Sequence, residues 1–444
     1  MKRIIYIILC VCSSTSLFAQ TTKELQVDGI KVIFKKTEKS VATVNLCIRG
    51  GVANITEAQQ GLEPLALRTA LNGGTATVSK EALSAELEKL GTDFEAGSRN
   101  DFSHMTMTCL RDNWDRSWAL FSDAVLHPAM DDTEFKLERD RMVSGAKQLE
   151  SDPDQYLRLL ATQQLFAGSD YAKRVNGEPA TLEKLTLQQA KDYYKQLLGK
   201  KKIYLVIVGN LNEQDIVAKV KSTLAALPQG DAPRTPTTTG IKPGVKINNR
   251  DLATNYIVGM ANAPKYYSPD GPLFQFAMSI LYDRYFVELR TKRSLSYAPS
   301  AGYNNSYIEN PMAQLYITTI DPKQSLEVMT AIINDVKENG FKPKEVENKK
   351  KSYLTNYYMT NQSSGAQANV MSTCEASGNW RIFDEINTRI GQVKTEDVNR
   401  VFSSYLTDVQ WTYLGKEDKV TAEDFKQPAP SKLPASKVKT TGKN

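Results

Sequence analysis

The sequence predicts an α+β fold made of two homologous α/β-sandwich domains of about 200 residues each. Three observations support this prediction. The 444-residue chain is too long for one compact core. A segment rich in Pro, Thr and Gly, 229–244, divides the chain near its middle. The same order of strands and helices then recurs on both sides of this linker, at a spacing of about 205 to 210 residues.

The first twenty residues are expected to be a secretory signal peptide. Lys2 and Arg3 precede the apolar run IIYIILCVC, and small and polar residues follow up to SLFAQ, with cleavage expected after Ala19. The apolar run is too short to span a bilayer, and no later stretch approaches the roughly 20 residues that a membrane helix needs. The mature chain is therefore expected to be exported, with no membrane span.

The composition of the mature chain excludes some classes of partner. Removal of Lys2 and Arg3 leaves 54 basic residues against 50 acidic ones, and the two kinds are interspersed. This balance is too mild to indicate a nucleic-acid partner. Three cysteines remain, Cys47, Cys109 and Cys374, and an odd, widely spaced set does not describe a disulfide framework. They are interpreted as buried small apolar residues, with a single disulfide as the less favoured alternative.

The first domain is expected over residues 21–228. Strands are predicted in LQVDGIKVIFKK and SVATVNLCIRGG, and a helix ending in a Gly-Gly turn in GLEPLALRTALNGGT. The segment LEKLGTDFEAGSRNDFSHMTMTCL predicts a helix end, a turn and two alternating strands. An amphipathic helix in WALFSDAVL and a long charged helix in FKLERDRMVSGAKQ follow, and the buried strand KKIYLVIVGNL closes the domain.

The second domain is expected over residues 245–425, with the same order of elements. It opens with strands in GVKINNRDLATNYIVGMANA, and LRTKRSLSYAPSAGYNNSYIENPMAQLYITTI predicts a helix end, a turn and strands. Helices in SLEVMTAIINDVKENG and FKPKEVENKKKSYLTNYY and a strand in VQWTYLGKED complete it. Strands and helices interleave without a regular βαβ rhythm, which favours α+β over a doubly wound sheet. The basic, Pro-containing tail 426–444 is predicted to be disordered.

Ordinary catalytic machinery is not visible in the residues. The chain has two histidines, His104 in a predicted strand and His127 before Pro128, whereas zinc enzymes usually take two or more His ligands. Both are interpreted as structural or exposed. There is no G-x-S-x-G elbow, and the S-x-x-K match from Ser144 to Lys147 lacks its companion motifs.

Four features resemble the insulinase (pitrilysin-type) zinc peptidase family. IRGG precedes a helix of the form GLxxxLxxxLxxGGT; LGTDFEAGSRNDFSHMTMTCL is similar to the family's edge-strand hairpin; ERDRMV follows about seventy residues after the helix; and LRTKRSLSYAPSAGY is the most specific match. The resemblance covers nearly the whole mature chain. It implies two sandwich domains that form half of a clamshell around a chamber.

The resemblance also implies that the zinc motif is degenerate. The family's first helix usually carries H-x-x-E-H, whose spacing puts two imidazoles and a carboxylate on one helical face. The aligned positions here are Pro64, Leu67 and Arg68. The remaining ligand, a Glu, should fall near residues 145–147, which are Gly145, Ala146 and Lys147. No metal is therefore expected on this chain, and peptidase activity is not expected from it alone.

In the second half, Arg290 and Tyr297 match an Arg-Tyr pair that active family members carry at the same spacing. In those proteins the pair holds the substrate and stabilises the developing oxyanion at the zinc site. Charged guanidinium donors and a phenolic hydroxyl suit that role. The alternative is structural: an ion pair between Arg290 and Glu288, with Tyr297 filling the edge of a core.

Some members of the family divide these parts between two chains, and this sequence matches the type without the zinc motif. The resemblance implies a non-catalytic subunit of a periplasmic heterodimeric zinc metallopeptidase. A homologous H-x-x-E-H subunit would bring zinc and a peptide would be the substrate, in a Gram-negative envelope as the signal ending FAQ indicates. The strands over 94–110 would pair within their sheet or accept a peptide at the sheet edge. The alternative is a peptide-binding or scaffold protein with the insulinase fold and no role in catalysis. An active enzyme with an unfamiliar metal site is less favoured.

Overall fold

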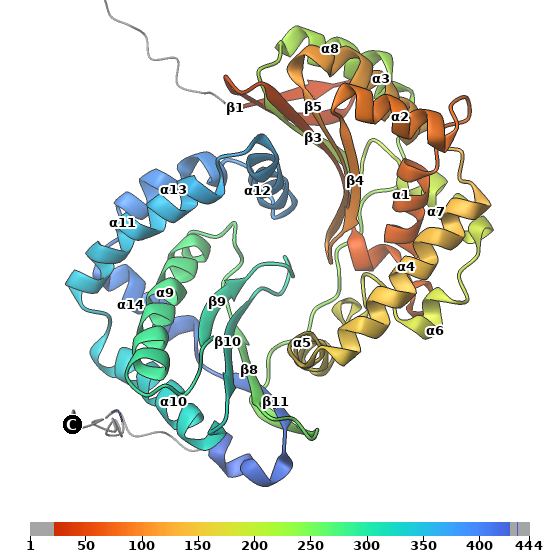
Figure 1. Ribbon diagram of the computed structural model, residues 1–444. Coiled ribbons are helices and arrows are strands. Elements are labelled where there is room, and N and C mark those ends of the chain that lie inside the picture. The colour runs from red at the N-terminus through yellow and green to blue at the C-terminus, as the bar shows by residue number, and fades with distance from the viewer. Residues whose placement is uncertain (1–21, 427–432, 434–444) are drawn as a thin grey trace, which may run out of the picture.

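The computed structural model describes residues 22–426 and residue 433 (Figure 1). The predicted signal peptide, 1–20, lies outside these residues. The predicted disordered tail, 426–444, also lies outside them, apart from Lys426 and Leu433.

Two mixed β-sheets, one in each half of the chain, organise the fold. The first has the strand order β1-β2-β6-β3-β5-β4, in which β6 pairs parallel with β2 and antiparallel with β3. Its strands are β1 Thr22–Val27, β2 Ile30–Lys36, β3 Val41–Arg49, β4 Asp93–Ser98, β5 Phe102–Leu110 and β6 Ile203–Gly209. The strand that closes the half is therefore inserted in the middle of the sheet.

The second sheet repeats this arrangement with the order β7-β11-β8-β10-β9. Its closing strand β11 pairs parallel with β7 and antiparallel with β8, as β6 does with β2 and β3. The strands are β7 Gly244–Asn249, β8 Asn255–Asn262, β9 Ser300–Asn304, β10 Met312–Thr319 and β11 Val409–Gly415. The matching topology confirms the predicted duplication and the α+β class.

Helices follow the predicted order in both halves. In the first half they are α1 Leu62–Asn72, α2 Lys80–Leu90, α3 Trp114–Leu126, α4 Asp132–Ser151, α5 Pro153–Leu165, α6 Pro179–Leu182, α7 Leu187–Leu197 and α8 Glu213–Ser222. In the second half they are α9 Asp270–Tyr285, α10 Pro322–Asn339, α11 Pro343–Thr360, α12 Ser364–Ala376, α13 Ile382–Gly391 and α14 Thr395–Tyr405. Residues 228–243 contain no helix or strand, and β7 begins at Gly244, the last residue of the expected linker 229–244.

Capping residues fix where helices α4 and α5 begin. Asp131 accepts hydrogen bonds from the amides of Thr133 (2.8 Å) and Glu134 (3.1 Å) at the start of α4. Asp152 ends α4 and caps α5 through the amide of Asp154 at 2.9 Å, with Pro153 in the first turn. Such caps satisfy amides that a helix leaves without internal partners. The Asp-Pro pair therefore breaks one long charged segment into two helices and turns the chain toward the second half.

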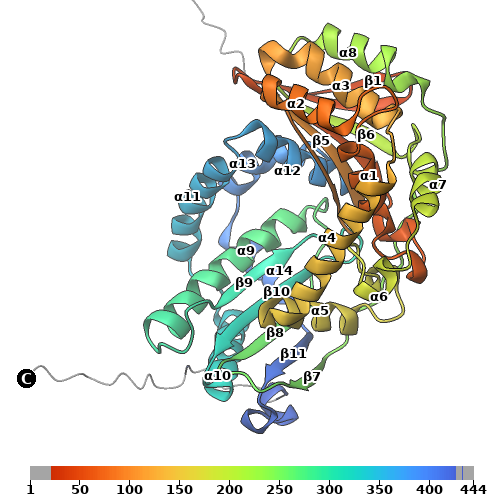
Figure 2. The ribbon, with the colours of Figure 1, turned by 45° about the vertical axis from the view of Figure 1, so that its right-hand side comes forward.

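Each sheet is covered on one face by helices of its own half and on the other by a helix of the opposite half. α12, from the second half, packs on β3 and β6 of the first sheet. α5, from the first half, packs on β8 and β11 of the second sheet (Figures 1 and 2). No local sequence pattern predicts this exchange of helices, because the exchange depends on contacts between segments far apart in the chain.

The exchanged helices form shared cores between the halves. Cys47 and Tyr204 of the first sheet belong to one cluster with Met371 and Cys374 of α12. The cysteines of the described residues, Cys47, Cys109 and Cys374, are free thiols in buried positions, as predicted. The same interface holds a buried carboxylate, Glu375, which pairs with Arg49 at 2.6 Å and Lys31 at 2.9 Å. The polar contacts add orientation to an interface whose stability comes mainly from apolar burial.

Candidate functional site

Helix α1 carries the three degenerate motif positions in the first half. Its N-cap, Gly61, has a φ of +87°, and a Cβ there would lie 2.5 Å from Leu182. Pro64 is tolerated in the first turn, where its missing N–H would have no intrahelical partner anyway. Leu67 is fully buried in the first core, whereas Arg68 is half-buried and borders a cavity.

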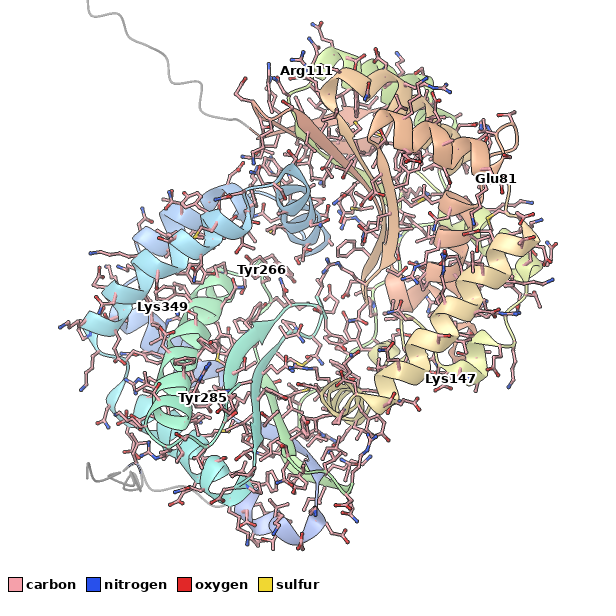
Figure 3. All side chains as sticks on the ribbon, viewed as in Figure 1. Glu81, Arg111, Lys147, Tyr266, Tyr285 and Lys349 are labelled. Carbon is pink, nitrogen blue, oxygen red and sulfur yellow. The ribbon has the colours of Figure 1, made fainter. Side chains whose placement is uncertain are left out.

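The cavity, of about 570 Å³, brings some of the predicted positions together and leaves others apart. Arg68 of α1 and Gly145 and Ala146 of α4 all border it. Lys147 lies on the outside of α4 (Figure 3), where its side chain is 63% exposed and pairs with Glu183 at 3.5 Å. Pro64 and Leu67 do not border the cavity. The structure thus brings Arg68 together with Gly145 and Ala146 at one cavity, and leaves Pro64, Leu67 and Lys147 outside it.

These residues do not fit a zinc ion, which the fold family implies. Pro64, Leu67, Gly145 and Ala146 have no side-chain donor atom, and the guanidinium of Arg68 is a fixed cation. Over the part of the chain that the structure describes, no three His, Cys, Asp or Glu side chains are grouped to hold a metal ion. His104 lies half-buried in β5, where burial lowers its pKa to about 4, and His127 is exposed.

One charged residue beside the motif was missed by the sequence analysis. Glu63 is buried in α1 and accepts hydrogen bonds from the hydroxyls of Ser103 in β5 and Tyr193 in α7. Asn54 donates to it at 3.5 Å. Burial raises the pKa of Glu63. These hydrogen bonds connect α1 to β5 and to α7, so Glu63 holds α1 in place. In the sequence, a Glu within an otherwise apolar helix face was the feature that could have indicated this residue.

Arg290 and Tyr297 form the second candidate group. Arg290 belongs to a π-helical turn, Phe286–Thr291, that continues from the end of α9. Its guanidinium carbon lies 4.9 Å from the centroid of the Phe286 ring and 5.8 Å from that of the Tyr297 ring. The structure therefore brings the predicted pair together. Short π-helical segments are rare and recur at functional sites.

The structural alternative for this pair is not observed. Glu288 pairs with Lys292 at 2.7 Å and with Arg293, not with Arg290. Tyr297 is 87% exposed, so it does not fill the edge of a core. Within residues 22–426, neither the Arg290 guanidinium nor the Tyr297 hydroxyl has a hydrogen-bond or ion-pair partner.

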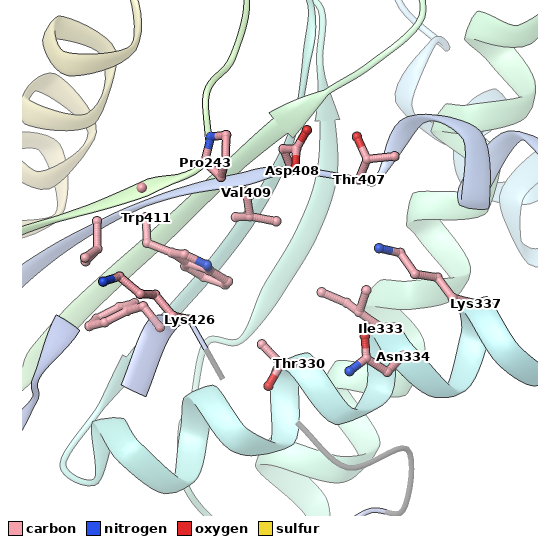
Figure 4. Close-up of a pocket in the computed structure, with 13 residues that line it drawn as sticks. Pro243, Thr330, Ile333, Asn334, Lys337, Thr407, Asp408, Val409, Trp411 and Lys426 are labelled. Carbon is pink, nitrogen blue, oxygen red and sulfur yellow. The ribbon is translucent and has the colours of Figure 1, made fainter. Parts of the chain in front are cut away.

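The pair is remote from the degenerate zinc motif of the same chain. Figure 3 labels Tyr266, which precedes α9 and lies near the first half, and Tyr285, at the opposite end of that helix. The π-helical turn that carries Arg290 follows directly after Tyr285. The cavity of the second half shown in Figure 4, about 350 Å³, is bordered by Lys337 and Trp411 but by neither member of the pair.

The predicted hairpin over 94–110 lies at a sheet edge. β4 pairs with β5 in antiparallel register on one side, and it is the last strand in the order of the first sheet. The other side of β4 has no strand partner among the described residues. Both expectations for this segment are therefore compatible with its place: it pairs within its own sheet, and the outer edge of β4 lacks a strand partner in the described part of the chain.

Comparison with known proteins identifies the class. The model of the insulinase family (peptidase family M16) matches residues 31–177, and that of the peptidase M16 inactive domain matches residues 184–353, which include Arg290 and Tyr297. The chain belongs to the insulinase family, M16. The predicted family resemblance is thereby confirmed, and the positions expected to carry H-x-x-E-H are Pro64, Leu67 and Arg68.

Individual relatives agree with this assignment. The chain is similar to the non-peptidase homolog YmxG of Helicobacter pylori, with 22% identity over 377 residues that cover 83% of this chain and 87% of the relative. A structure of the peptidase M16 inactive domain from Pseudomonas fluorescens matches with a TM-score of 0.81 and 18% identity, over 89% of this chain and 98% of the other. The periplasmic protease PqqL of Escherichia coli matches with a TM-score of 0.77 and 16% identity, over 90% of this chain and 46% of PqqL. The structural likenesses show the fold.

Among the helices of the described residues, none is both long and apolar enough to cross a membrane.

Proposed function

We propose that this chain is the non-catalytic subunit of a heterodimeric zinc peptidase of the insulinase family. A homologous partner with H-x-x-E-H would hold the zinc ion and the general base. This chain would supply Arg290 and Tyr297 to the partner's site, together with part of the chamber wall. The substrate would be a peptide.

The exposed Arg290–Tyr297 pair is the observation that carries this proposal. The two polar groups lie on one surface, adjacent to each other, with no partner among residues 22–426. An isolated guanidinium and phenol gain little from this arrangement in the single chain. At an interface they become directed donors for a substrate carbonyl and its oxyanion.

The distance between this pair and α1 supports action on a partner rather than on the same chain. The pair lies beyond the end of α9 that is remote from the first half, so it does not reach the cavity beside Arg68. A second chain whose first half faces this surface would place its own α1 there. This arrangement explains together why the chain lacks a metal set and why the pair is retained.

The proposed location is the periplasm of a Gram-negative bacterium. The N-terminal pattern of Lys2, Arg3 and an apolar run supports export. The similarity of fold to a periplasmic protease from Escherichia coli is consistent with it.

A second candidate is a peptide-binding or scaffold protein without a role in catalysis. The similarity to a relative named as a non-peptidase homolog favours it. Here Arg290 and Tyr297 would be remnants. The two candidates differ in one requirement, since the first needs a homologous H-x-x-E-H chain and the second does not.

Purification of the chain from its host tests the proposal. We expect it to copurify with a homologous chain that carries H-x-x-E-H, with zinc bound in a one-to-one ratio to that partner. Isolation of the chain by itself, in a host whose neighbouring reading frames encode no such relative, would contradict the heterodimer.

A further inference from the structure

The cavity that Arg68 borders between α1 and α4 has a positively charged lining. Of the side chains that border it, none is an Asp or a Glu. Five carry a positive charge, and they come from four separate segments of the first half: Arg68, Arg99, Arg141, Lys173 and Arg174.

Three of the five cations are already compensated. Lys173 pairs with Asp170 at 2.6 Å and donates to the carbonyl of Ile55 at 2.6 Å. Arg141 pairs with Glu138 at 2.7 Å, and Arg174 with Glu150 at 3.4 Å. Their charges are therefore largely offset by these carboxylates, and the net positive charge of the wall rests on Arg68 and Arg99.

Arg68 and Arg99 have none. In the described part of the chain, no carboxylate lies within ion-pairing distance of either guanidinium. Arg68 is half-buried. The guanidinium carbon of Arg99 lies 5.7 Å from the centroid of the Phe102 ring. Ser98 also borders the cavity, and its buried hydroxyl oxygen has no hydrogen-bond partner among the described residues. Unpaired donors in a partly desolvated wall favour an anionic ligand with several acceptor oxygens.

The position of the cavity indicates that the anion belongs to a peptide. Ser98 is the last residue of β4, the edge strand, and Arg99 follows it. A peptide strand that pairs with the unoccupied edge of β4 would lead into the cavity at that end. The volume of about 570 Å³ is suited to one or two side chains rather than to a single ion.

We propose that this cavity binds a carboxylate of a peptide, either the C-terminal carboxylate or that of an Asp or Glu side chain. Arg68 and Arg99 supply charged donors, and Ser98 lies beside them at the end of β4. The backbone edge of β4 provides affinity with little dependence on sequence, and the cavity provides the preference for negative charge. The site lies on this chain alone and does not require the proposed heterodimer.

Binding of four fluorescent ten-residue peptides to the isolated full chain tests this inference. The first contains two Glu residues and a free C-terminus, the second has Gln in place of Glu, the third has Lys, and the fourth is the Glu peptide with an amidated C-terminus. We expect the Glu peptide to bind about ten to a hundred times more tightly than the peptides that lack the recognised carboxylate, which is the range for a lost charged hydrogen bond. If the Gln peptide is weakened, the ligand is a side-chain carboxylate; if the amidated peptide is weakened, it is the C-terminus.

Variants connect the preference to the cavity. Arg68→Leu and Arg99→Gln should each reduce binding of the Glu peptide by about tenfold or more. Lys221→Gln, at an exposed position on α8 with the same change of net charge, should leave it unchanged. Arg99 is exposed, so its variant should fold even if the half-buried Arg68 variant does not, and the melting temperature of each reports this. Equal binding of all four peptides, or a preference for the Glu peptide that survives Arg99→Gln in a folded chain, would overturn the inference.

Discussion

The guanidinium carbon of Arg290 lies 5.8 Å from the ring centroid of Tyr297, and 87% of the tyrosine is exposed. An arginine beside an aromatic ring is ordinary, and such exposed contacts contribute about 0.5–1 kcal/mol. What distinguishes this pair is that the structure offers no internal use for it, since Glu288 binds other cations. Substitutions of Arg290 and Tyr297 therefore test the proposed function most directly.

Substitution of either residue should lower peptide hydrolysis in a reconstituted mixture with the H-x-x-E-H partner. For Arg290→Ala or Tyr297→Phe, we expect turnover to fall by about one to three orders of magnitude, the range for loss of an oxyanion donor. Steady-state kinetics of the mixture measures this. Because both side chains are exposed, the melting temperature of the isolated chain should be unchanged.

An exposed tyrosine and an exposed arginine elsewhere on the chain provide matched controls for these variants. Tyr358→Phe on α11 removes a hydroxyl from a residue that is 53% exposed, and Arg116→Ala on α3 removes a cation whose side chain is 57% exposed. Both should leave turnover unchanged. Equal rates for the Arg290 and Tyr297 variants and for these controls would remove the pair from the mechanism.

The contact between the halves should depend on pH through Asp101. Its carboxylate accepts hydrogen bonds from the Tyr171 hydroxyl and from the amide of Ile308 at 2.9 Å, and burial raises its pKa to about 6. A raised pKa means that the folded state binds the proton more tightly than the unfolded state. The associated stability is complete below the unfolded pKa of 3.8 and is lost as the pH rises through about 6.

Urea unfolding from pH 4 to 7 should show this effect as a difference between wild type and Asp101→Asn. Relative to the variant, the wild-type free energy of unfolding should fall by at most about 3 kcal/mol across the interval. A constant offset between the two curves would show that Asp101 titrates alike in both states.

His104 should have the opposite pH dependence. Burial, with a smaller contribution from Arg99, lowers its pKa from 6.5 to about 4. Its contribution to stability is therefore complete above 6.5 and is lost as the pH falls toward 4. His104→Gln should remove up to about 3 kcal/mol of this acid-side loss, again by urea unfolding. A wild type and variant that lose stability in parallel on acidification would contradict it.

Because α12 packs on the sheet of the opposite half, its buried side chains should contribute to the free energy of unfolding. Met371 of α12 is fully buried in the core shared with the first sheet. Met371→Ala should lower the free energy of unfolding by about 2–5 kcal/mol, through lost burial and the cavity left behind. Met359→Ala, at a position that is 63% exposed on α11, should change it by no more than about 0.5 kcal/mol. An equally small effect at Met371 would mean that α12 does not hold the halves together.

Local patterns were sufficient to predict the repeated elements. Alternating residues define β4 and β5, the Gly-Gly turn ends α1, and the closing strand β6 has the uninterrupted apolar character of buried sheet positions. The duplication then followed from order and spacing. The proximity of Arg290 and Tyr297 was also predictable, because only a short turn separates them.

Features that depend on long-range packing were not predictable. The placement of α5 and α12 on the opposite sheets has no local signature, since an apolar helix face does not specify its partner. Lys147 belongs to the segment 145–147 in which a ligand is expected. Its side chain points outward, because successive residues of a helix face different directions, whereas Gly145 and Ala146 border the cavity. The cationic cavity was not predicted for the same reason, because its charges come from four segments of the chain.

Hydrolysis of a peptide by three samples tests the central claim most directly: this chain alone, the purified H-x-x-E-H partner alone, and their equimolar mixture, with zinc measured in each. We expect no turnover and no stoichiometric zinc in the first sample, weak or no turnover in the second, and rapid turnover in the third that is lost with Arg290→Ala. Hydrolysis by this chain alone with bound metal, or a partner whose full rate does not change when this chain is added, would contradict the account.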